Sequence, residues 1–562
     1  MRRRLLPAAL LAVSAQAGAA APLDLAWWRD GTTQVVQLRD GGPALPVFDG
    51  SRQVPLGSLW KLFVFAYAVD TDTATPDYPC RGREREEVYC CDPGGSIARD
   101  AALAQSCGPF FAPARLMLSA SAWRGWWTRR LGREPAGDFA WLADPARLAP
   151  ERTVRLDSLL RALASVPPAT RSQAEGALLR VVLDGRAAGS ASWLGSQLRV
   201  KTYSWFTPQG KAARVRLGGG AGWLADGTPV WFGGQGTSTS ILQQWAPRLA
   251  AALPPVAETQ DSGCVLVDYF TRYPLKSVRS ADGPAAAGPL QGRYQVGFEN
   301  GQSLALRSSG ELVLGKNSSG KPVLRGRMGI NEYVARVIDR EASAQEPEAA
   351  KALAVAARTY LQQNARVEAG CQRIADSSAT QRVSPNPATP AALAIASWTD
   401  QLVLDGVQVR YHTSQTGPNT LAWTVAVAQS RQGKRYDELL ASAYPGASLA
   451  GIGNAGAVCQ RLVQNEAWLA RTLPRWQRVL QREAGYETPA QATTVCALSS
   501  GAPYSEQSRN RIFMRPLATR EDRITLAHEF LHLGLRGHPR GQDEAYVEQL
   551  ARRLVDIELE AI

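Results

Sequence analysis

The sequence lacks any apolar stretch beyond its amino-terminal residues that is long enough to cross a bilayer, so a membrane-spanning protein is not expected. It has no internal repeat and no low-complexity tract, which argues against a repeat architecture and against long disordered segments. No nucleic-acid recognition motif accompanies its basic charge, so we expect no nucleic-acid partner. Histidine is scarce, with 4 in 562 residues, and all but one of them lie in a single run. That run is therefore the first place to look for a metal site.

The amino-terminal residues have the pattern of a secretory signal peptide. Arginines at positions 2–4 precede the apolar run Leu5–Val13, and small residues follow. We expect residues 1–20 to be removed by cleavage near Ala17 or Ala19, through the Sec route or, given the arginines, the twin-arginine route. No Cys follows the run to take a lipid. The mature chain is therefore expected to be exported without a transmembrane anchor, most simply to the periplasm of a Gram-negative bacterium.

Composition and cysteine content fit a folded, exported protein. The length predicts three or four domains, and a 45% share of hydrophobic residues can fill several cores. The formal net charge is +13, and it drops by three when the signal-peptide arginines are removed. In the envelope a basic surface can attract an anionic polymer such as peptidoglycan. The alternative is that the charge simply keeps the chain soluble. The 8 cysteines suit a compartment that permits disulfides. Four lie early and four late, so each half can be closed internally, but spacing does not determine the pairing.

Five residues in the first part of the chain form a candidate acyl-transfer site. Ser58 and Lys61 stand three residues apart at the start of an apolar helix, where a lysine held neutral in a dry pocket can take the serine proton. Ser106 lies where a second serine motif would follow, and Lys201-Thr202 precedes a strand-like stretch. The set resembles the motifs of serine penicillin-binding proteins and class D β-lactamases. In that fold Ser58 is the nucleophile and Lys61 its base. Ser106, Lys201 and Thr202 would then bind the substrate.

Two positions depart from this pattern. Gly108 stands where Asn is usual, and Tyr203 replaces the glycine that lets substrate lie along the strand. A side chain at that place would crowd an acyl-peptide. The alternative is therefore a degenerate relative that binds peptidoglycan or a peptide without acyl transfer.

A helical pair is predicted in the middle of the chain. A short helix from Asn331 to about Asp339 leads to a break at 341–346, and Pro347, which suits a first helical position, opens a second helix. Glu341 stands at the break rather than on a solvated helix face, which makes it a candidate general acid at the mouth of the pair. The alternative is an ordinary surface glutamate in a turn.

Strands are expected before this pair. Residues 264–270 form a predicted strand that opens the middle domain, and the alternating leucines of 304–306 and 312–314 predict a hairpin. The Pro/Ala/Gly-rich stretch 280–290 and the turn at 254–255 are typical of domain boundaries.

Several motifs around Glu341 resemble the SpoIID/LytB family. In chain order they are Glu332-Tyr333-Val334, Arg340-Glu341-Ala342, the A-V-A-A-R-T-Y run of Ala354 to Tyr360, and Tyr411-His412-Thr413-Ser414. The resemblance implies an α+β domain that cleaves peptidoglycan glycan strands as a lytic transglycosylase, with Glu341 as acid and base. It also implies that Arg358, His412 and Ser414 bind the glycan. One departure is Pro418, which stands where the family has a second glycine.

The sharpest motif is the histidine run, in a mostly helical region. His528 and His532 are four residues apart on a predicted helix and can bind one Zn²⁺, while Glu529 between them is placed to polarise water. The third ligand is either His538, at the metzincin interval, or Glu544, on a helix that a turn would bring back, and we favour Glu544. The pattern predicts a zinc-peptidase-like site with Glu529 as general base. The alternative is a pair of packed core histidines.

The expected architecture is an α+β multidomain protein. Its parts are a signal peptide at 1–20, a serine-transpeptidase-like α/β domain at 21–256, a SpoIID-like α+β domain at 262–454 and a mainly helical zincin-like domain at 455–562. The favoured function is peptidoglycan remodelling by a hydrolase or lyase in the cell envelope. The competitor is a binding or assembly protein that holds peptidoglycan or an envelope protein without chemistry. The whole chain also resembles secreted proteins that accompany bacterial α2-macroglobulins, which implies a role in trapping or processing proteases.

Overall fold

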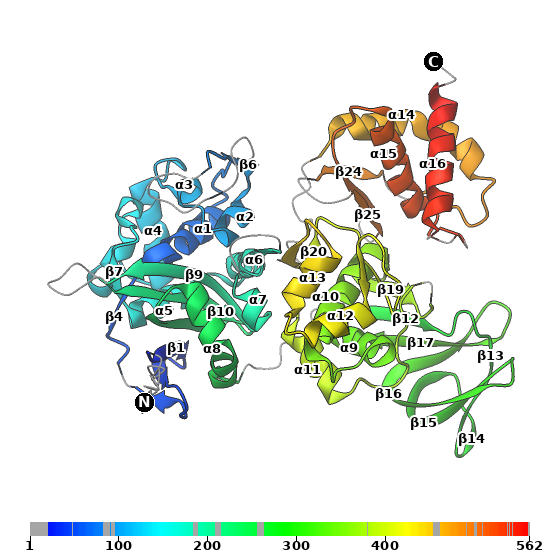
Figure 1. Ribbon diagram of the computed structural model, residues 1–562, viewed down its shortest axis with the longest axis horizontal. Helices are drawn as coiled ribbons and strands as arrows, with labels where there is room; N and C mark the ends of the chain where they lie inside the picture. Colours follow the sequence, from blue (N-terminus) through cyan, green and yellow to red (C-terminus); the bar gives the residue numbers. More distant parts are fainter. Residues whose placement is uncertain are drawn as a thin grey trace, which may run out of the picture.

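The structure is a computed structural model that describes most of the chain. The described residues are 21–47, 49–82, 90, 96–183, 189–207, 215–255, 263–378, 380–452, 461–489, 492–498, 503–507, 510–536, 538, 540–541 and 543–559. The predicted signal peptide at 1–20 lies outside them, as do Cys91 and Cys459. The fold is α+β and multidomain, as expected, and the middle domain contacts both of the others (Figure 1).

The amino-terminal domain is built on a six-stranded antiparallel sheet with helices on both faces. In spatial order its strands are β3 (Leu45–Pro46), β2 (Thr32–Leu38), β1 (Leu23–Arg29), β11 (Pro229–Gln235), β10 (Arg216–Leu224) and β9 (Leu198–Phe206). One core lies between the sheet and α8 (Ser238–Ala252). The other lies between the sheet and α1 (Trp60–Asp70), α5 (Leu156–Ala164) and α6 (Pro168–Leu178). The first strand of the domain thus pairs with the last, which closes the fold.

Helix α1 is the central helix of this domain. Every residue from Trp60 to Ala68 is buried, Lys61 included, because a helix that is apolar on all sides must be enclosed. Ser58 lies in the single 3₁₀ turn Gly57–Leu59 that leads into it. The smaller elements around it are α2 (Arg99–Ala104), α3 (Gly108–Phe111), α4 (Ala120–Leu131), α7 (Ala191–Leu194) and the strand pairs β4–β7 (Gln53–Pro55, Thr153–Arg155) and β5–β6 (Tyr78–Pro79, Ser96–Ile97).

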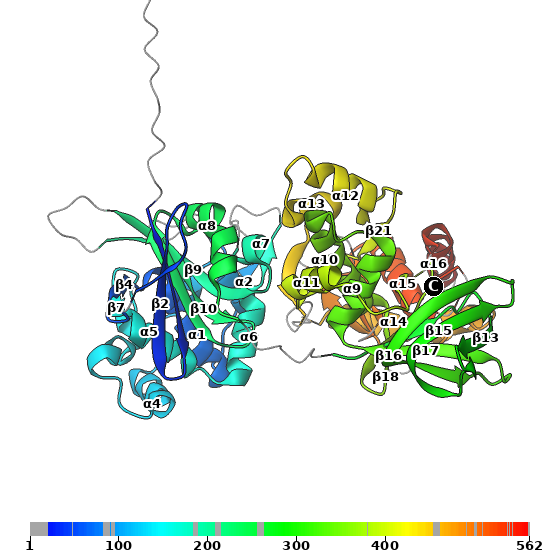
Figure 2. The ribbon, with the colours of Figure 1, turned by 90° about the horizontal axis from the view of Figure 1, so that it is seen from below.

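The middle domain joins an eight-stranded sheet to a group of helices (Figures 1 and 2). The sheet order is β14 (Gly283–Pro284), β13 (Leu275–Ser280), β15 (Gly288–Phe298), β16 (Ser303–Lys316), β17 (Pro322–Met328), β12 (Val265–Tyr269), β19 (Cys371–Ala375) and β18 (Arg366–Glu368). Strand β12 is the predicted opening strand. Helices α9 (Ile330–Glu341) and α10 (Pro347–Asn364) follow, and α10 begins at Pro347 as the sequence predicts. Glu341 is the last residue of α9 rather than part of the break.

The hairpin predicted from the leucines of 304–306 and 312–314 is wrong. Both groups lie in the single strand β16. Gly310 adopts a φ of +107° and the Ser308 hydroxyl accepts a hydrogen bond from the backbone N–H of Leu312, so the strand bends there and continues. The actual hairpin joins β16 to β17 through a turn at 317–321.

The boundary expected at 280–290 is also wrong. These residues form the turns of β13, β14 and β15, where Gly283 and Gly288 take φ angles of +125° and +128° that other residues rarely adopt. Glycine and proline there serve tight turns within one sheet. Residues 254–255, also expected at a boundary, do follow α8, the last helix of the amino-terminal domain.

The first two domains share a small sheet and a core. Strand β8 (Val181–Val182) pairs with β23 (Ser448–Gly451), which pairs with β20 (Leu402–Asp405). Arg180 forms an ion pair with Asp405 at 2.9 Å, and the Tyr436 hydroxyl donates to the Ala191 carbonyl oxygen. One buried apolar cluster contains residues of both domains. Residues on both sides of the expected boundary near residue 256 therefore pack into one shared core and one shared sheet. The remaining helices of the middle domain are α11 (Pro390–Trp398), α12 (Trp423–Ser430) and α13 (Tyr436–Ala443).

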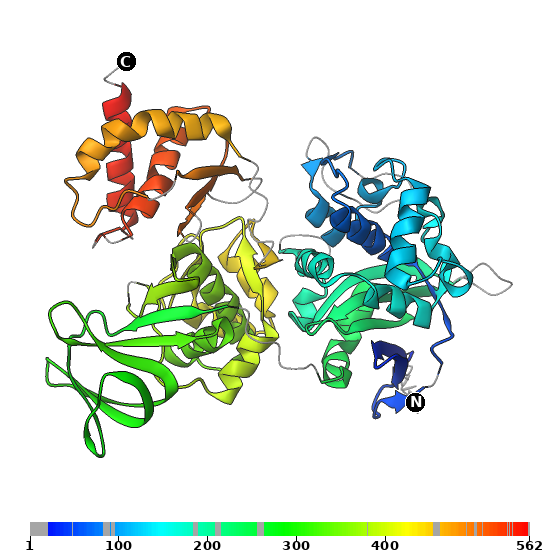
Figure 3. The ribbon, with the colours of Figure 1, turned by 180° about the vertical axis from the view of Figure 1, so that it is seen from behind.

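The carboxy-terminal domain is mostly helical, as expected, with a small sheet (Figure 3). Its elements are α14 (Val463–Leu480), α15 (Arg520–Gly534), α16 (Glu544–Leu559) and the strands β24 (Thr494–Ala497), β26 (Arg511–Met514) and β25 (Tyr504–Glu506), in that spatial order. Helix α15 begins with a capping box in which the Thr519 side chain and the Asp522 side chain bond each other's backbone. This fixes the start of the helix that carries the histidine motif.

Two disulfides have both partners in the described part of the chain. Cys90 bonds Cys107, and Cys264 bonds Cys371, so each closes within one half of the chain. Cys80 and Cys496 are disulfide-bonded as well. Among the described helices, none combines the length and the apolar character needed to cross a membrane.

Candidate functional site

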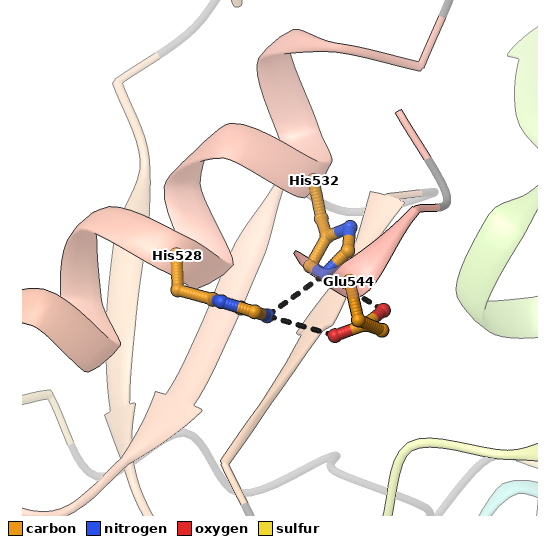
Figure 4. Close-up of side chains that lie close together, drawn as sticks. All are labelled: His528, His532 and Glu544. Carbon is orange, nitrogen blue, oxygen red and sulfur yellow. Dashed lines mark hydrogen bonds and ion pairs between the residues drawn. The ribbon is translucent and has the colours of Figure 1, made fainter. Parts of the chain in front are cut away.

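Helices α15 and α16 bring two histidines and a glutamate together (Figure 4). His528 and His532 are one turn apart on α15, and Glu544 is the first residue of α16. One ligand atom from each residue lies within 4.8 Å of the other two. The two histidine Nε2 atoms are 3.1 Å apart, and the Glu544 oxygens lie 3.1 Å and 3.5 Å from them.

This spacing fits a single zinc ion. Bonds of about 2.0–2.1 Å in tetrahedral geometry place donor atoms roughly 3.3 Å apart, and imidazole nitrogen with carboxylate oxygen is a zinc donor set. The outer ring nitrogens also have the partners that metal-binding histidines use. His528 Nδ1 lies 3.0 Å from Glu548, and His532 Nδ1 lies 3.2 Å from the Gly541 carbonyl oxygen. His528, His532 and Glu544 could therefore hold the metal.

Glu529 and His538 have different surroundings. Glu529 is 4% exposed, burial raises its pKa, and its Oε2 has no hydrogen-bond partner among the described residues. An unpartnered buried oxygen is costly in a purely structural helix. His538 stacks on Tyr546 with 5.1 Å between ring centroids, and its Nδ1 accepts from the Arg540 N–H. The structure thus brings Glu544, and not His538, to the two histidines.

A residue of the middle domain reaches the same carboxylate. Arg410 lies in β21 (Arg410–His412), which pairs with β22 (Thr420–Ala422), and its guanidinium donates to Glu544. Burial alone would raise the pKa of Glu544. Hydrogen bonds from His528 and His532, together with the charge of Arg410, outweigh burial and hold this pKa well below its usual range. No sequence motif pointed to Arg410, because the contact joins two domains.

Glu341 lies at the carboxyl end of α9, against the loop that follows β19. The backbone N–H of Arg382 donates to its Oε1 at 2.6 Å. Burial raises the pKa of the Glu341 carboxyl to about 7; the Arg382 hydrogen bond opposes the rise, and the nearby Asp376 carboxyl adds to it. A large fraction of this carboxyl is therefore protonated near neutral pH, which is the state that a general acid needs.

Three tyrosines and a glutamine surround the same region. The Tyr333 hydroxyl donates to Gln381, and the Gln381 side-chain amide donates to the Tyr411 hydroxyl at 2.7 Å. Tyr360 and Tyr411 make an edge-to-face contact with 6.0 Å between ring centroids. Burial and the nearby charge of Glu341 raise the pKa of Tyr411. Glu341 thus faces neutral hydroxyl groups that are held in a fixed network.

The raised pKa of Glu341 predicts a pH dependence of stability. The native state holds this proton more tightly than the unfolded chain, so the free energy of unfolding should fall as the pH rises from the ordinary value to about 7 and level off above it. The expected loss is about 1 to 3 kcal/mol. Urea unfolding near pH 5 and near pH 8 should show it in the wild type and not in Glu341→Gln. Parallel pH profiles of the two proteins would contradict the assignment.

The other residues expected to bind glycan are placed differently. Arg358 is fully buried in α10, and its guanidinium donates to the carbonyl oxygens of Ala396 and Thr399 at the end of α11, at 3.0 and 2.7 Å. It satisfies a helix C-terminus, and because the side chain is fully buried it is not open to a glycan. His412 and Ser414 are exposed beside Tyr411, and the Ser414 N–H donates to His412 Nδ1 at 3.1 Å.

Ser58, Lys61 and Ser106 meet at the start of α1. Lys61 is fully buried, and its Nζ lies 3.4 Å from Ser58 Oγ and 3.2 Å from Ser106 Oγ. It also donates to the Ser106 carbonyl oxygen at 2.6 Å. Ser106 adopts a φ of +61°, uncommon for serine, immediately before the disulfide-bonded Cys107. The structure therefore brings these three predicted residues together.

Lys201 and Thr202 lie on β9, on opposite faces of the sheet. Lys201 is buried and donates to the Thr202 carbonyl oxygen at 3.0 Å. Tyr203 is 3% exposed and packs on Gly57, where an added Cβ would lie 2.9 Å from the Tyr203 Cβ. The tyrosine therefore fills the gap between β9 and the turn that carries Ser58.

We expect a fluorescent penicillin to leave Ser58 unlabelled. An acyl donor would have to lie along β9 beside Ser58, where Tyr203 packs against Gly57. Gel fluorescence after incubation measures this, with Ser58→Ala as the matched control and a functional penicillin-binding protein as the positive control. Stoichiometric labelling of the wild type that disappears in Ser58→Ala would instead identify a working acyl-transfer site.

Two family models match parts of the chain. A family described as predicted secreted protein (DUF2300) matches residues 82–211 and 419–540. A family described as Stage II sporulation protein (SpoIID) matches residues 320–403, which include Glu341. The chain is also 46% identical over 528 residues to "Uncharacterized protein YfaQ" of Escherichia coli (strain K12), and the match covers 93% of each chain.

Solved structures similar to part of the chain include class D β-lactamases. The Sebaldella termitidis β-lactamase match covers 42% of this chain and 89% of that one, with 6% identity and a TM-score of 0.26. The match to the carboxy-terminal domain of the Bacillus licheniformis BlaR penicillin receptor covers 42% of this chain and 88% of that domain, with 12% identity and a TM-score of 0.26.

Proposed function

Since the chain belongs to the family of the Escherichia coli protein YfaQ and carries matches to a predicted secreted protein and to SpoIID, we propose that it is exported and remodels peptidoglycan in the cell envelope. Its place of action is the periplasm. The middle domain cleaves the glycan strand, with Glu341 as the reacting group.

The observation that carries this proposal is the state of Glu341. Its carboxyl has a pKa raised to about 7 by burial. Arg340, Asp376 and Arg382, the charged groups around it, line an open hollow of about 650 Å³. A protonated acid beside a polar hollow suits attack on a glycosidic bond near neutral pH.

The chemistry needs one group that is first an acid and then a base. Glu341 donates its proton to the glycosidic oxygen while the bond from that oxygen to C1 breaks. The resulting carboxylate then takes the proton of the 6-hydroxyl group of the same sugar as that oxygen bonds to C1. No water is consumed, and one product carries a 1,6-anhydro ring. The Arg382 N–H holds the carboxylate in place. Exposed His412 and Ser414 follow Tyr411, whose pKa the charge of Glu341 raises, and they are the candidates to hold the sugar.

Incubation of the purified mature protein with peptide-stripped sacculi tests this function. Release of products with a 1,6-anhydro end, identified by mass spectrometry, is the expected result. Products with a free reducing end would indicate hydrolysis instead, and intact sacculi would indicate binding without chemistry.

A second candidate function rests on the carboxy-terminal domain. His528, His532 and Glu544 have the donor atoms and the spacing for zinc, and Glu529 has a buried oxygen without a partner among the described residues. A bound zinc ion would supply Lewis acidity for peptide-bond hydrolysis. The protein's own contribution is Glu529, held beside the histidines to take a proton from water.

The alternative to catalysis is strongest for the amino-terminal domain. Tyr203 fills the space between β9 and the Ser58 turn. On this alternative the domain holds peptidoglycan or an envelope protein partner without acyl transfer, and the middle domain carries the chemistry.

A further inference from the structure

The eight-stranded sheet carries three arginines that the glycan chemistry above does not use. Arg279 on β13, Arg293 on β15 and Arg307 on β16 are exposed and line one open hollow of about 560 Å³. The residues that line it include Gln295 and Ala305, and none of them is acidic. These strands lie at the end of the molecule away from the amino-terminal domain (Figures 1 and 2).

Strand register sets these arginines close together. Arg293 pairs directly with Arg307 across β15 and β16, and in the neighbouring row Arg279 pairs with Gln295. Residues paired on one face of a sheet have Cβ atoms about 4.5–5.5 Å apart, and like charges in that arrangement repel. No ion pair joins any of the three arginines to an acidic group within the described ranges. An uncompensated group of cations concentrates anions from outside.

The arginine hollow adjoins the hollow beside Glu341. Asn386 lines both of them. Its side-chain oxygen accepts from the Arg307 N–H at 2.8 Å, and four residues earlier the Arg382 N–H donates to Glu341. One short loop therefore fixes the arginine face relative to the candidate acid. The two hollows therefore meet at Asn386, and Arg340, Asp376 and Arg382, which surround Glu341, line the second of them.

We propose that Arg279, Arg293 and Arg307 form an anion-binding subsite for the peptide carboxylates of the peptidoglycan strand whose glycan reaches Glu341. The subsite rests on the proposed function of the middle domain. It applies only if the same peptidoglycan strand occupies the hollow beside Glu341 and the arginine hollow that the shared loop joins to it. Guanidinium groups bind carboxylates through paired, charge-assisted hydrogen bonds. In a peptide-bearing strand the lactyl carboxyl group of each muramic acid is bonded to the peptide, so the free carboxylates are those of the peptide. Removal of the peptide by an amidase leaves one lactyl carboxylate per disaccharide, held on the glycan itself. The subsite therefore makes the protein prefer peptide-bearing strands.

Binding to two kinds of sacculi tests the subsite. The proteins carry Glu341→Gln, so no strand is cut during the measurement. The test variant adds Arg279→Gln, Arg293→Gln and Arg307→Gln. The control variant instead adds Arg471→Gln, Arg478→Gln and Arg553→Gln, which removes the same charge from exposed positions of α14 and α16. Co-sedimentation with sacculi that keep their peptides, and with sacculi stripped of them by an amidase, gives the affinities.

We expect the test variant to bind peptide-bearing sacculi roughly tenfold more weakly than the control variant, and stripped sacculi equally well. Equal losses in both variants would overturn the subsite in favour of general charge attraction. An equal loss on stripped sacculi would overturn it in favour of the lactyl carboxylates of the glycan, and no loss on either kind of sacculus would remove it altogether. Because nothing is cleaved, these outcomes are independent of the lytic activity. If the parent Glu341→Gln protein binds neither kind of sacculus, the proposed function itself fails.

Discussion

Replacing Glu341 with Gln is expected to lower the release of 1,6-anhydro products from peptide-stripped sacculi by roughly 10²- to 10⁴-fold. Glutamine keeps the shape of the side chain but can neither give a proton to the glycosidic oxygen nor accept one afterwards. In the wild type, burial raises the pKa of this carboxyl to about 7, so release should also decline as the pH rises above that value. Chromatographic quantification of the products over a pH series measures both effects.

The matched control for this variant is Glu346→Gln. Glu346 precedes α10 by one residue, and its carboxylate pairs with Arg431 at the surface. A surface ion pair contributes little to stability, so this variant should release products within about twofold of the wild type. Wild-type release by Glu341→Gln would remove Glu341 from the mechanism. Equal losses in both variants would point to damage in the break between α9 and α10.

His528→Ala should abolish zinc binding by the purified mature protein. Two of three protein ligands cannot hold the ion well, and the structure places the His528 and His532 Nε2 atoms 3.1 Å apart at the point where they would share it. Elemental analysis of protein prepared without chelator should give about one zinc per wild-type chain and none in the variant. A wild type without zinc would make the histidine helix a packed core element.

His538→Ala and Glu544→Ala identify the third ligand in the same assay. His538 stacks on Tyr546 and should be dispensable for zinc, whereas Glu544 lies 3.1 Å from His528 Nε2 and should be required. Zinc that survives Glu544→Ala but is lost in His538→Ala would reverse this assignment.

Short-range patterns in the sequence predicted much of these sites. Helical spacing is enough to put Ser58 beside Lys61 and His528 beside His532, and the start of α10 follows from the chemistry of Pro347. The choice of Glu544 over His538 depended on a turn that returns the next helix, which is also a local feature. The glycine and leucine pattern around Gly310 did not distinguish a hairpin turn from a bulge within one strand. Glycine serves both, and here it lies in a bulge of the long strand β16.

Contacts between distant segments left no local signal. Arg410 reaches Glu544 from another domain, and Arg293 opposes Arg307 only because two strands pair in that register. Arg358 is a case in which a sequence motif was present but did not predict the role of the side chain. It belongs to a family motif, and only the fold shows that its guanidinium is buried against the end of α11.

Cutting the chain near residue 256 would not release two intact fragments. The carboxy-terminal fragment would lose β8 and expose the backbone N–H and C=O groups of β23, an open strand edge that promotes aggregation. The amino-terminal fragment would expose Leu179, Val181 and Ala191, which are now buried against the middle domain. Expression trials of the separate domains should therefore yield poorly soluble products. The first two domains should melt together in one cooperative step, despite their distinct sheets.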